Sequence, residues 1–256
     1  MKAPIISGII SICFLGMVGC TGQPQPAAPS SAPVAPAVAA PESPDAGATA
    51  TPEWRDAFSV TAAALRPEGD NPYFPLRPGR VMKYAGTEDG ERVELVITVT
   101  DKTEVIDGVT TRVVEERESK DGELVEVSRN WFAVDPATND LYYFGEEVDM
   151  YRNGRIAGHE GAWRSGVDGA RFGLLLPGTP RPGDRYYQEV APGVALDRAE
   201  VLSLAETLVT PAGSFTNCLR TEETSGLKAD ERGYKTYAPG VGLLKDGALL
   251  LQSVPR

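Results

Sequence analysis

Residues 89–122 read DGERVELVITVTDKTEVIDGVTTRVVEERESKDG, and this stretch decides the fold class. Between its Asp-Gly pairs, residues 92–101 and 110–118 are rich in β-branched side chains and carry a polar face, which is typical of half-buried strands. Asp-Gly favours a two-residue hairpin turn, because both central positions of that turn require a positive φ. The stretch therefore predicts antiparallel strands that are joined by tight turns.

The same pattern extends in both directions. Turn signals of this kind stand at Asp89-Gly90, Asp107-Gly108, Asp121-Gly122, Asn153-Gly154 and Asp246-Gly247. Further strand-like runs cover residues 124–134, 184–190, 200–209, 214–224 and 233–237. About ten to twelve antiparallel strands must close or fold over to bury one face. We expect an all-β domain, an antiparallel meander that forms a strongly curved sheet, an open barrel or a sandwich.

One short helix is expected ahead of the strands. Residues 51–54 combine a capping Thr, a Pro at the first helical position and an acid in the first turn. Apolar side chains then recur at helical spacing up to residue 66: Trp54, Phe58, Ala62 and Leu65. The pattern predicts an amphipathic helix that packs its aromatic face on the domain.

The N-terminus has the features of an export signal. The apolar run over residues 3–18 is shorter than the roughly 20 residues of a membrane span and fits a secretory signal peptide. Residues 17–20, Met-Val-Gly-Cys, resemble the lipobox of bacterial lipoproteins, in which Leu usually stands where Met17 does. The resemblance implies cleavage before Cys20, a diacylglycerol thioether on Cys20 and acylation of its new amine, for example by palmitate. The alternative is an ordinary secreted protein with a free Cys20.

These features predict the domain organisation and the location. Residues 1–19 are the signal peptide, and residues 20–52 are the acylated Cys and a Pro/Ala-rich tether that we expect to be disordered. Residues 53–256 form a single β-rich extracytoplasmic domain. The lipid bilayer is the expected partner through Cys20, and Thr21, where an Asp would favour retention in the inner membrane, indicates the outer membrane if the cell has one.

Charge and cysteine content limit the function classes. Lys2 is the only charged residue of the signal peptide, so the mature chain has 24 basic and 36 acidic residues and a net charge of −12. This charge argues against a nucleic-acid partner. Once Cys20 is acylated, Cys218 is the only thiol, so no disulfide forms within the chain. Cys218 lies in a strand-like run and is expected to be a buried small apolar residue.

Several segments between residue 71 and about residue 245 carry a family resemblance: residues 71–79 (NPYFPLRPG), 131–133 (WFA), 143–146 (YFGE), 166–170 (GVDGA), 183–184 (GD), 187–189 (YQE) and 237–242 (YAPGVG). Over this range the chain resembles an uncharacterised family of exported bacterial β-rich proteins. The family usually has Trp near the position of Met82. The resemblance implies an extracytoplasmic β-fold and no particular activity.

Aromatic residues are concentrated between residues 131 and 163. On adjacent strands, alternate side chains face the same side of a sheet. The concentration predicts either an aromatic core cluster or an apolar groove for a lipid-like or glycan ligand. For the groove, the candidate ligand-binding residues are Trp131, Tyr143, Tyr151 and Trp163.

Catalytic and metal signals are weak. His159 is the only histidine, and we interpret it as an exposed residue at a strand end beside a turn. Two acidic loops, residues 135–140 and 146–149, lack the spacing of a recognised calcium loop. We therefore predict no catalytic set, no metal and no cofactor. A cleft that held two acids at glycosidase separation would favour a hydrolase instead, the candidates being Glu146, Glu147, Asp149, Asp168 and Glu189.

The leading hypothesis is a membrane-anchored lipoprotein of the cell envelope that binds an apolar ligand or a partner protein, or assists envelope assembly, and is not an enzyme. The lipobox, the tether, the β-meander and the lack of a catalytic constellation support this hypothesis. The alternatives are an extracytoplasmic hydrolase that uses paired carboxylates and a purely structural envelope protein.

Overall fold

The computed structural model describes residues 53–254, and in this range the chain forms fifteen strands and no helix. The lipobox, Cys20 and the tether lie outside the described residues. The strands are β1 (Val81–Glu88), β2 (Glu91–Ile106), β3 (Val109–Lys120), β4 (Glu123–Val134), β5 (Leu141–Arg152), β6 (Arg155–Gly158), β7 (Trp163–Arg164), β8 (Arg171–Leu176), β9 (Arg185–Tyr187), β10 (Glu189–Val190), β11 (Asp197–Thr210), β12 (Gly213–Ser225), β13 (Arg232–Ala238), β14 (Gly242–Asp246) and β15 (Leu249–Leu251). Within residues 53–254, no helix is long and apolar enough to cross a membrane.

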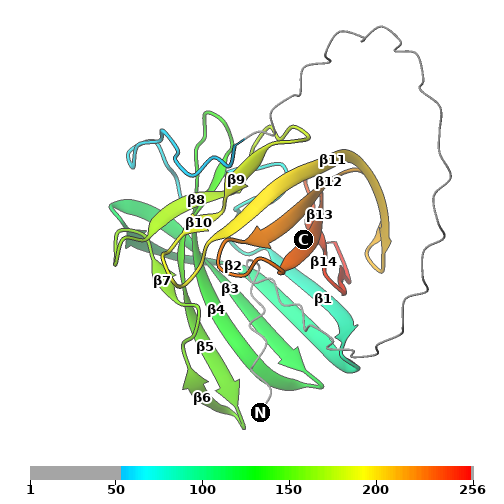
Figure 1. Cartoon of the computed structure of the whole chain (residues 1–256). Coiled ribbons are helices and arrows are strands. Elements are labelled where there is room, and N and C mark those ends of the chain that lie inside the picture. Colours follow the sequence, from blue (N-terminus) through cyan, green and yellow to red (C-terminus); the bar gives the residue numbers. More distant parts are fainter. Residues whose placement is uncertain (1–52, 255–256) are drawn as a thin grey trace, which may run out of the picture. The chain divides into compact units, whose positions relative to one another are not determined.

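The strands form one antiparallel sheet that is nearly closed. Its order is β10-β8-β5-β4-β3-β2-β1-β15-β14-β13-β12-β11-β9, and β6 and β7 pair with β5 outside this path (Figure 1). The two ends of this order, β9 and β10, are separated in the chain by Gln188 alone. The segment 185–190 thus pairs with β11 on one side and with β8 on the other. The all-β prediction is confirmed, and of the forms considered the sheet is the barrel-like one.

Four of the five predicted Asp-Gly or Asn-Gly turns form as expected. Both residues have positive φ in each pair, as in Asp89 (51°) and Gly90 (86°). The fifth turn is shifted by one residue, because Asp246 ends β14 and pairs with Leu249 of β15. Gly247, with a φ of 52°, therefore opens a turn that Ala248 completes.

The N-terminal helix is absent from the described part of its range, and its expected start at Thr51 and Pro52 lies outside that part. From residue 53 to residue 66 the chain is irregular. The backbone N–H of Arg55 donates to Arg185 O (3.0 Å), and the N–H of Tyr187 donates to Arg55 O (2.9 Å), so this residue pairs with β9 instead of with a helical turn. The aromatic side chains diverge, since Trp54 packs on Tyr187 and Phe58 on Tyr142.

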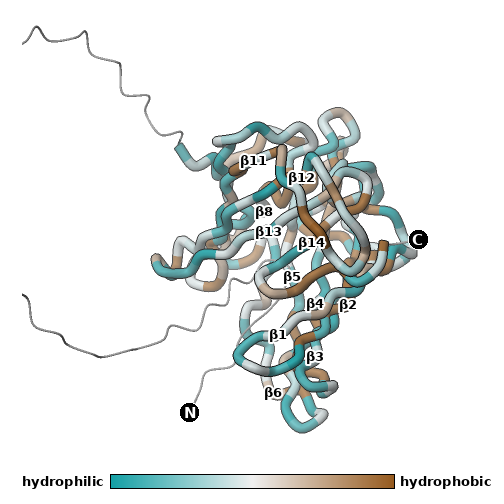
Figure 2. Tube along the Cα trace, turned by 90° about the vertical axis from the view of Figure 1, so that its right-hand side faces the viewer, coloured by the Kyte–Doolittle hydropathy of each residue, from teal (hydrophilic) through white to brown (hydrophobic). Residues whose placement is uncertain are grey.

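The interior follows the alternation of the strands. In β2 the buried side chains are Val93, Leu95, Ile97, Val99 and, at the end of the strand, Ile106, each at most 3% exposed. Figure 2 shows repeated changes between hydrophobic and hydrophilic residues along the trace. Cys218 is completely buried, as the sequence predicted, and this burial raises the pKa of its thiol.

Candidate functional site

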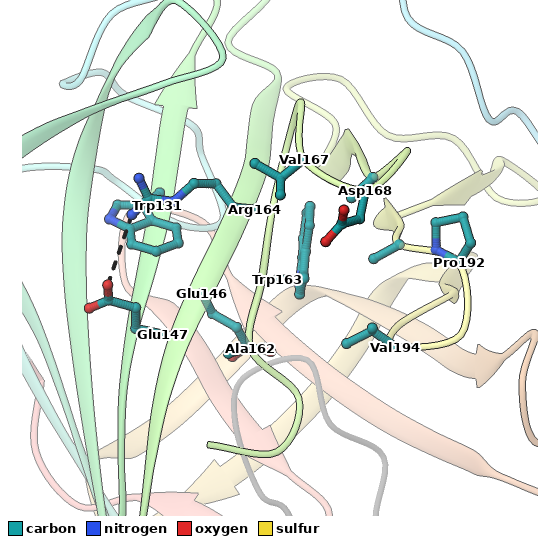
Figure 3. Close-up of a pocket in the computed structure, with 12 residues that line it drawn as sticks. Trp131, Glu146, Glu147, Ala162, Trp163, Arg164, Val167, Asp168, Pro192 and Val194 are labelled. Atoms are coloured by element: carbon teal, nitrogen blue, oxygen red, sulfur yellow. Dashed lines mark ion pairs between the residues drawn. The ribbon is translucent and has the colours of Figure 1, made fainter. Parts of the chain in front are cut away.

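A cavity of about 350 Å³ opens beside Trp131 and Trp163 (Figure 3). Its walls come from β4, β5 and β7, from the loop before β8, and from the connection that follows β10. The volume lies near the lower limit of the range for small-molecule pockets. The residues that line the cavity are Trp131, Glu146, Glu147, Ala162, Trp163, Arg164, Val167, Asp168, Ala170, Ala191, Pro192 and Val194.

Gly145 of β5 lets the two tryptophans come together. It has a φ of 133°, and a Cβ at this position would stand 2.4 Å from the carbonyl oxygen of Trp163 and 3.2 Å from Cε3 of Trp131. Any larger residue would push β7 away from β5. A glycine is therefore required for both space and backbone conformation.

The loop that carries Asp168 is fixed by hydrogen bonds. The hydroxyl of Ser165 donates to Asp107 Oδ2 (2.9 Å) and accepts from the backbone N–H of Phe172 (3.1 Å). Asp168 and Gly169 then turn the chain with φ values of 50° and 77°. The Asp168 side chain is thus presented at the rim by an ordered loop.

Trp131 forms one half of the cavity and already faces a cation. The Arg164 guanidinium lies over the Trp131 ring, with 4.6 Å from Cζ to the ring centroid. Arg164 Nη2 is 2.7 Å from Glu104 Oε1 and 3.9 Å from Glu147 Oε1, and Trp131 Nε1 donates to Glu104 Oε2 (3.1 Å). The guanidinium charge is therefore balanced by two carboxylates and held against an indole face.

Trp163 forms the other half. Its ring packs edge-on against Tyr143, with 5.1 Å between the centroids, and its exposed fraction is 7%. In the view of Figure 3, Trp163 stands between the group of Trp131 and Arg164 and the group of Asp168 and Pro192. None of the cation–π contacts found among residues 53–254 involves Trp163.

Glu146 connects the cavity to the interior of the sheet. Burial of its carboxyl raises its pKa to about 8, a hydrogen bond with Tyr143 opposes the shift, and the charge of Asp197 adds to it. A carboxyl with this pKa is largely protonated at neutral pH and ionises just above it. Glu146 is thus a titratable group in contact with the cavity.

Behind Glu146 lies a second pair of acids, Glu189 and Asp197. Glu189 is completely buried, and its Oε1 accepts a 2.7 Å hydrogen bond from the Asp197 backbone N–H. Burial, followed by the repulsion from Asp197, raises the pKa of Glu189 well above its ordinary range. Burial also raises the pKa of Asp197 to about 7. The pair holds less negative charge at neutral pH than two ordinary carboxylates would.

The acidic interior continues to a buried lysine. Lys235 Nζ of β13 lies 2.8 Å from Glu223 Oε2 of β12 and 3.7 Å from Asp246 Oδ2 of β14. Gln188 Nε2 donates to Glu223 Oε1 (3.3 Å). Burial raises the pKa of Asp246 to about 6, although Lys235 opposes the shift. The sheet therefore encloses charged groups beside its apolar core.

The sequence reasoning missed this interior network. The sequence signal for this network is the alternation of β12, in which every second side chain points inward, namely Leu219, Thr221, Glu223 and Ser225. An acid at an inward position of a strand indicates a buried polar partner. The partner itself, Lys235, belongs to the next strand and was recognisable only from the register that pairs Thr221 with it.

The structure brings together two of the four predicted ligand-binding residues. Trp131 and Trp163 line the cavity. Tyr143 is completely buried behind Trp163, where its hydroxyl donates to Asn130 Oδ1 (3.0 Å). Tyr151 lies near the end of β5, where it pairs with Ile156 of β6, and it is not part of the cavity lining.

The five acids of the hydrolase hypothesis separate into three locations. Glu146, Glu147 and Asp168 line the cavity, and Glu189 is buried behind it. Asp149 points elsewhere, with its Oδ2 3.1 Å from Arg129 and its Oδ1 3.2 Å from the ring of His159, whose side chain is 65% exposed. Within residues 53–254, no group of three or more His, Cys, Asp or Glu side chains is arranged to hold a metal ion.

Comparison with known proteins gave no match to a family model, to a curated protein or to a solved structure. The lipobox resemblance and the resemblance to an exported β-rich family therefore stay predictions. Three of the segments that carry the second resemblance, residues 131–133, 143–146 and 166–170, contribute side chains to the cavity.

Proposed function

We propose that this chain is a membrane-anchored extracytoplasmic lipoprotein that binds a small ligand in the Trp131–Trp163 cavity. The observation that carries the proposal is the cavity itself, in which two indole rings meet fixed charged groups. The lipobox at Cys20 and the Pro/Ala-rich segment up to residue 52 support the anchored location. Binding at such a site requires no catalytic chemistry.

The cavity walls are ordered before any ligand arrives. Trp131 is held by Glu104 and Arg164, and Trp163 is held by Tyr143. A preorganised site loses less conformational entropy on binding, and rigid aromatic surfaces contribute contact area at low cost. The small volume favours a compact ligand over a long acyl chain. A ring or a compact head group is therefore the expected size.

The experiment is native mass spectrometry of the purified full chain, before and after incubation with an envelope extract from the producing organism. We expect a mass increase that corresponds to one small molecule. Trp163→Ala should lose the adduct, whereas Trp54→Ala should keep it, because Trp54 packs on Tyr187 away from the cavity lining. An adduct of equal occupancy in the Trp163 variant would refute binding at this cavity.

A second candidate function is a glycoside hydrolase. The specific observation is that Glu146, with a pKa of about 8, shares the cavity with Glu147, whose carboxylate lies near Arg164. Glycosidases pair a protonated acid with an ionised carboxylate. Release of nitrophenol from a panel of aryl glycosides, abolished in both Glu146→Gln and Glu147→Gln, would establish this function. Activity that persists in both variants would exclude it.

A further inference from the structure

The two halves of the cavity have similar components but differ in charge balance. In the Trp131 half, the indole and the carboxylates of Glu104 and Glu147 surround the Arg164 guanidinium. Around Trp163 the cavity lining includes apolar side chains such as Val194 and the acids Glu146 and Asp168, which lie on opposite sides of the indole in the view of Figure 3. No ion pair found within the described residues 53–254 involves either of these two acids.

The charges around the Trp163 half favour a positive ligand. Among the lining residues, Arg164 is the only basic one, and its charge is already balanced by Glu104 and Glu147. Behind the wall, Glu189 and Asp197 add further acidic groups, although their raised pKa values reduce their negative charge at neutral pH. Asp168 at the rim and, at a pH above its pKa of about 8, Glu146 would attract a cation and repel an anion in this half.

The aromatic wall adds a second reason. An indole is the best aromatic face for a cation, and desolvation strengthens the attraction. Arg164 on Trp131 demonstrates this type of contact in the same cavity. Val167, Pro192 and Val194 provide apolar surface that a bare metal ion would not use but that the methyl or methylene groups of an organic cation would cover.

We propose that the cavity binds the ammonium group of a small organic cation against Trp163, and that Glu146 and Asp168 of the same cavity lining supply the negative charge. This inference rests on the proposed binding function and names the class of its ligand. The contact is of the same type as that between the Arg164 guanidinium and Trp131, in which a cation lies on an indole face near carboxylates. The shared chemistry is an alkylammonium, either free in solution or as a lipid head group.

The test compares choline with 3,3-dimethyl-1-butanol, its neutral carbon isostere, and with methyl glucoside as a neutral ring. The full chain is kept in solution with a non-ionic, sugar-free detergent at pH 8.5. Binding is followed by calorimetry and by the indole N–H signals of the three tryptophans. We expect choline to shift the Trp163 signal and the isostere to bind about tenfold more weakly.

Matched variants locate the charge effect. Glu146→Gln and Asp168→Asn should each weaken choline binding several-fold, while Glu123→Gln, the same change at an exposed position in the β3–β4 hairpin, should not. Equal affinity for choline and its isostere would overturn the inference. So would methyl glucoside binding without choline binding, but that result would leave the proposed function intact.

The two sources of the ammonium group are separated by a vesicle experiment. Phosphatidylcholine vesicles that compete with free choline for the Trp163 signal would assign the site to a lipid head group, and vesicles without effect would assign it to a free cation. If choline leaves the Trp163 signal unchanged, the inference is wrong. The mass-spectrometric experiment then decides independently whether the cavity binds a different ligand.

Discussion

The backbone N–H of Asp197 donates a 2.7 Å hydrogen bond to Oε1 of Glu189, and this bond holds the Glu189 carboxyl against the backbone of a second buried acid inside the sheet. At most 9% of either residue is exposed. The chain places these acids where water cannot solvate their charges. Their protonation therefore has direct consequences for the stability of the fold.

We expect the domain to be more stable at pH 5 than at pH 9. Burial raises the pKa of Glu189 above its ordinary range, that of Asp197 to about 7 and that of Glu146 to about 8. The folded state thus binds more protons than the unfolded state between about pH 4 and pH 8. Stability is greatest below the ordinary carboxyl pKa and falls as the pH rises through the raised values.

The measurement is urea unfolding, followed by tryptophan fluorescence, at several values of pH. The free energy of unfolding should decrease by about 2 kcal/mol or more across this range. Glu189→Gln should flatten the dependence, because the amide stays neutral at every pH. The opposite slope, with higher stability at pH 9, would contradict the assignment of raised pKa values to these acids.

Lys235→Met should strongly destabilise the fold. Lys235 lies 2.8 Å from Glu223, and each of the two residues is at most 3% exposed. Removing one partner of a buried ion pair costs about 3–5 kcal/mol, since it leaves an uncompensated buried charge. The midpoint of urea unfolding measures the effect. The double variant Lys235→Met/Glu223→Gln should recover a large part of the loss, and a double variant as unstable as the single one would argue against this explanation.

Gly145→Ala should destabilise the fold and disturb the cavity. The new Cβ would stand 2.4 Å from the carbonyl oxygen of Trp163, and the φ of 133° is unfavourable for alanine. We expect a loss of about 2–4 kcal/mol and a shift of the Trp163 indole signal. Gly122→Ala is the matched control, because its φ is 85° but nothing lies within 4 Å of its Cβ position. A loss no greater than about 1 kcal/mol in both variants would show that β7 moves away easily.

Local signals were sufficient to predict the fold class, several long strands such as β2, β3, β4 and β12, and most turns, whereas β1, β5 and β8 were not among the predicted runs. The inward side chains of β2, such as Val93 and Ile97, follow the alternation seen in the sequence. Asp89-Gly90 takes the positive φ values that its composition predicts. The turn near Asp246 was displaced by one residue, because the pairing of β14 with β15, and not the dipeptide alone, sets the register.

Long-range relationships could not be predicted from the sequence. Helical spacing between Trp54 and Phe58 was misleading, since tertiary contacts with Tyr187 and Tyr142 separate the two rings. The cavity joins Trp131 to Asp168 and Val194, which meet only through sheet topology and loop hydrogen bonds. The sequence indicated an aromatic concentration, but only the packing distinguishes the core residue Tyr143 from the cavity residue Trp163.

The affinity for an organic cation should rise with pH through about pH 8. A bound ammonium group favours the ionised form of Glu146, so binding releases the proton that this carboxyl holds at neutral pH. The other groups around it are Tyr143 on β5, Glu189 on β10 and Asp197 on β11 in the interior, with Glu147, Arg164 and Asp168 on the cavity wall.

Calorimetry of choline binding in buffers of different ionisation enthalpy measures the released proton. Affinity should increase several-fold between pH 6.5 and pH 9, and Glu146→Gln should remove most of the increase, because glutamine has no proton to lose. Asp168→Asn serves as the comparison, since it removes a rim carboxylate but keeps Glu146 titratable, and should therefore lower affinity while preserving the slope. An affinity that is independent of pH in the unmodified chain would mean that the ammonium group does not approach Glu146.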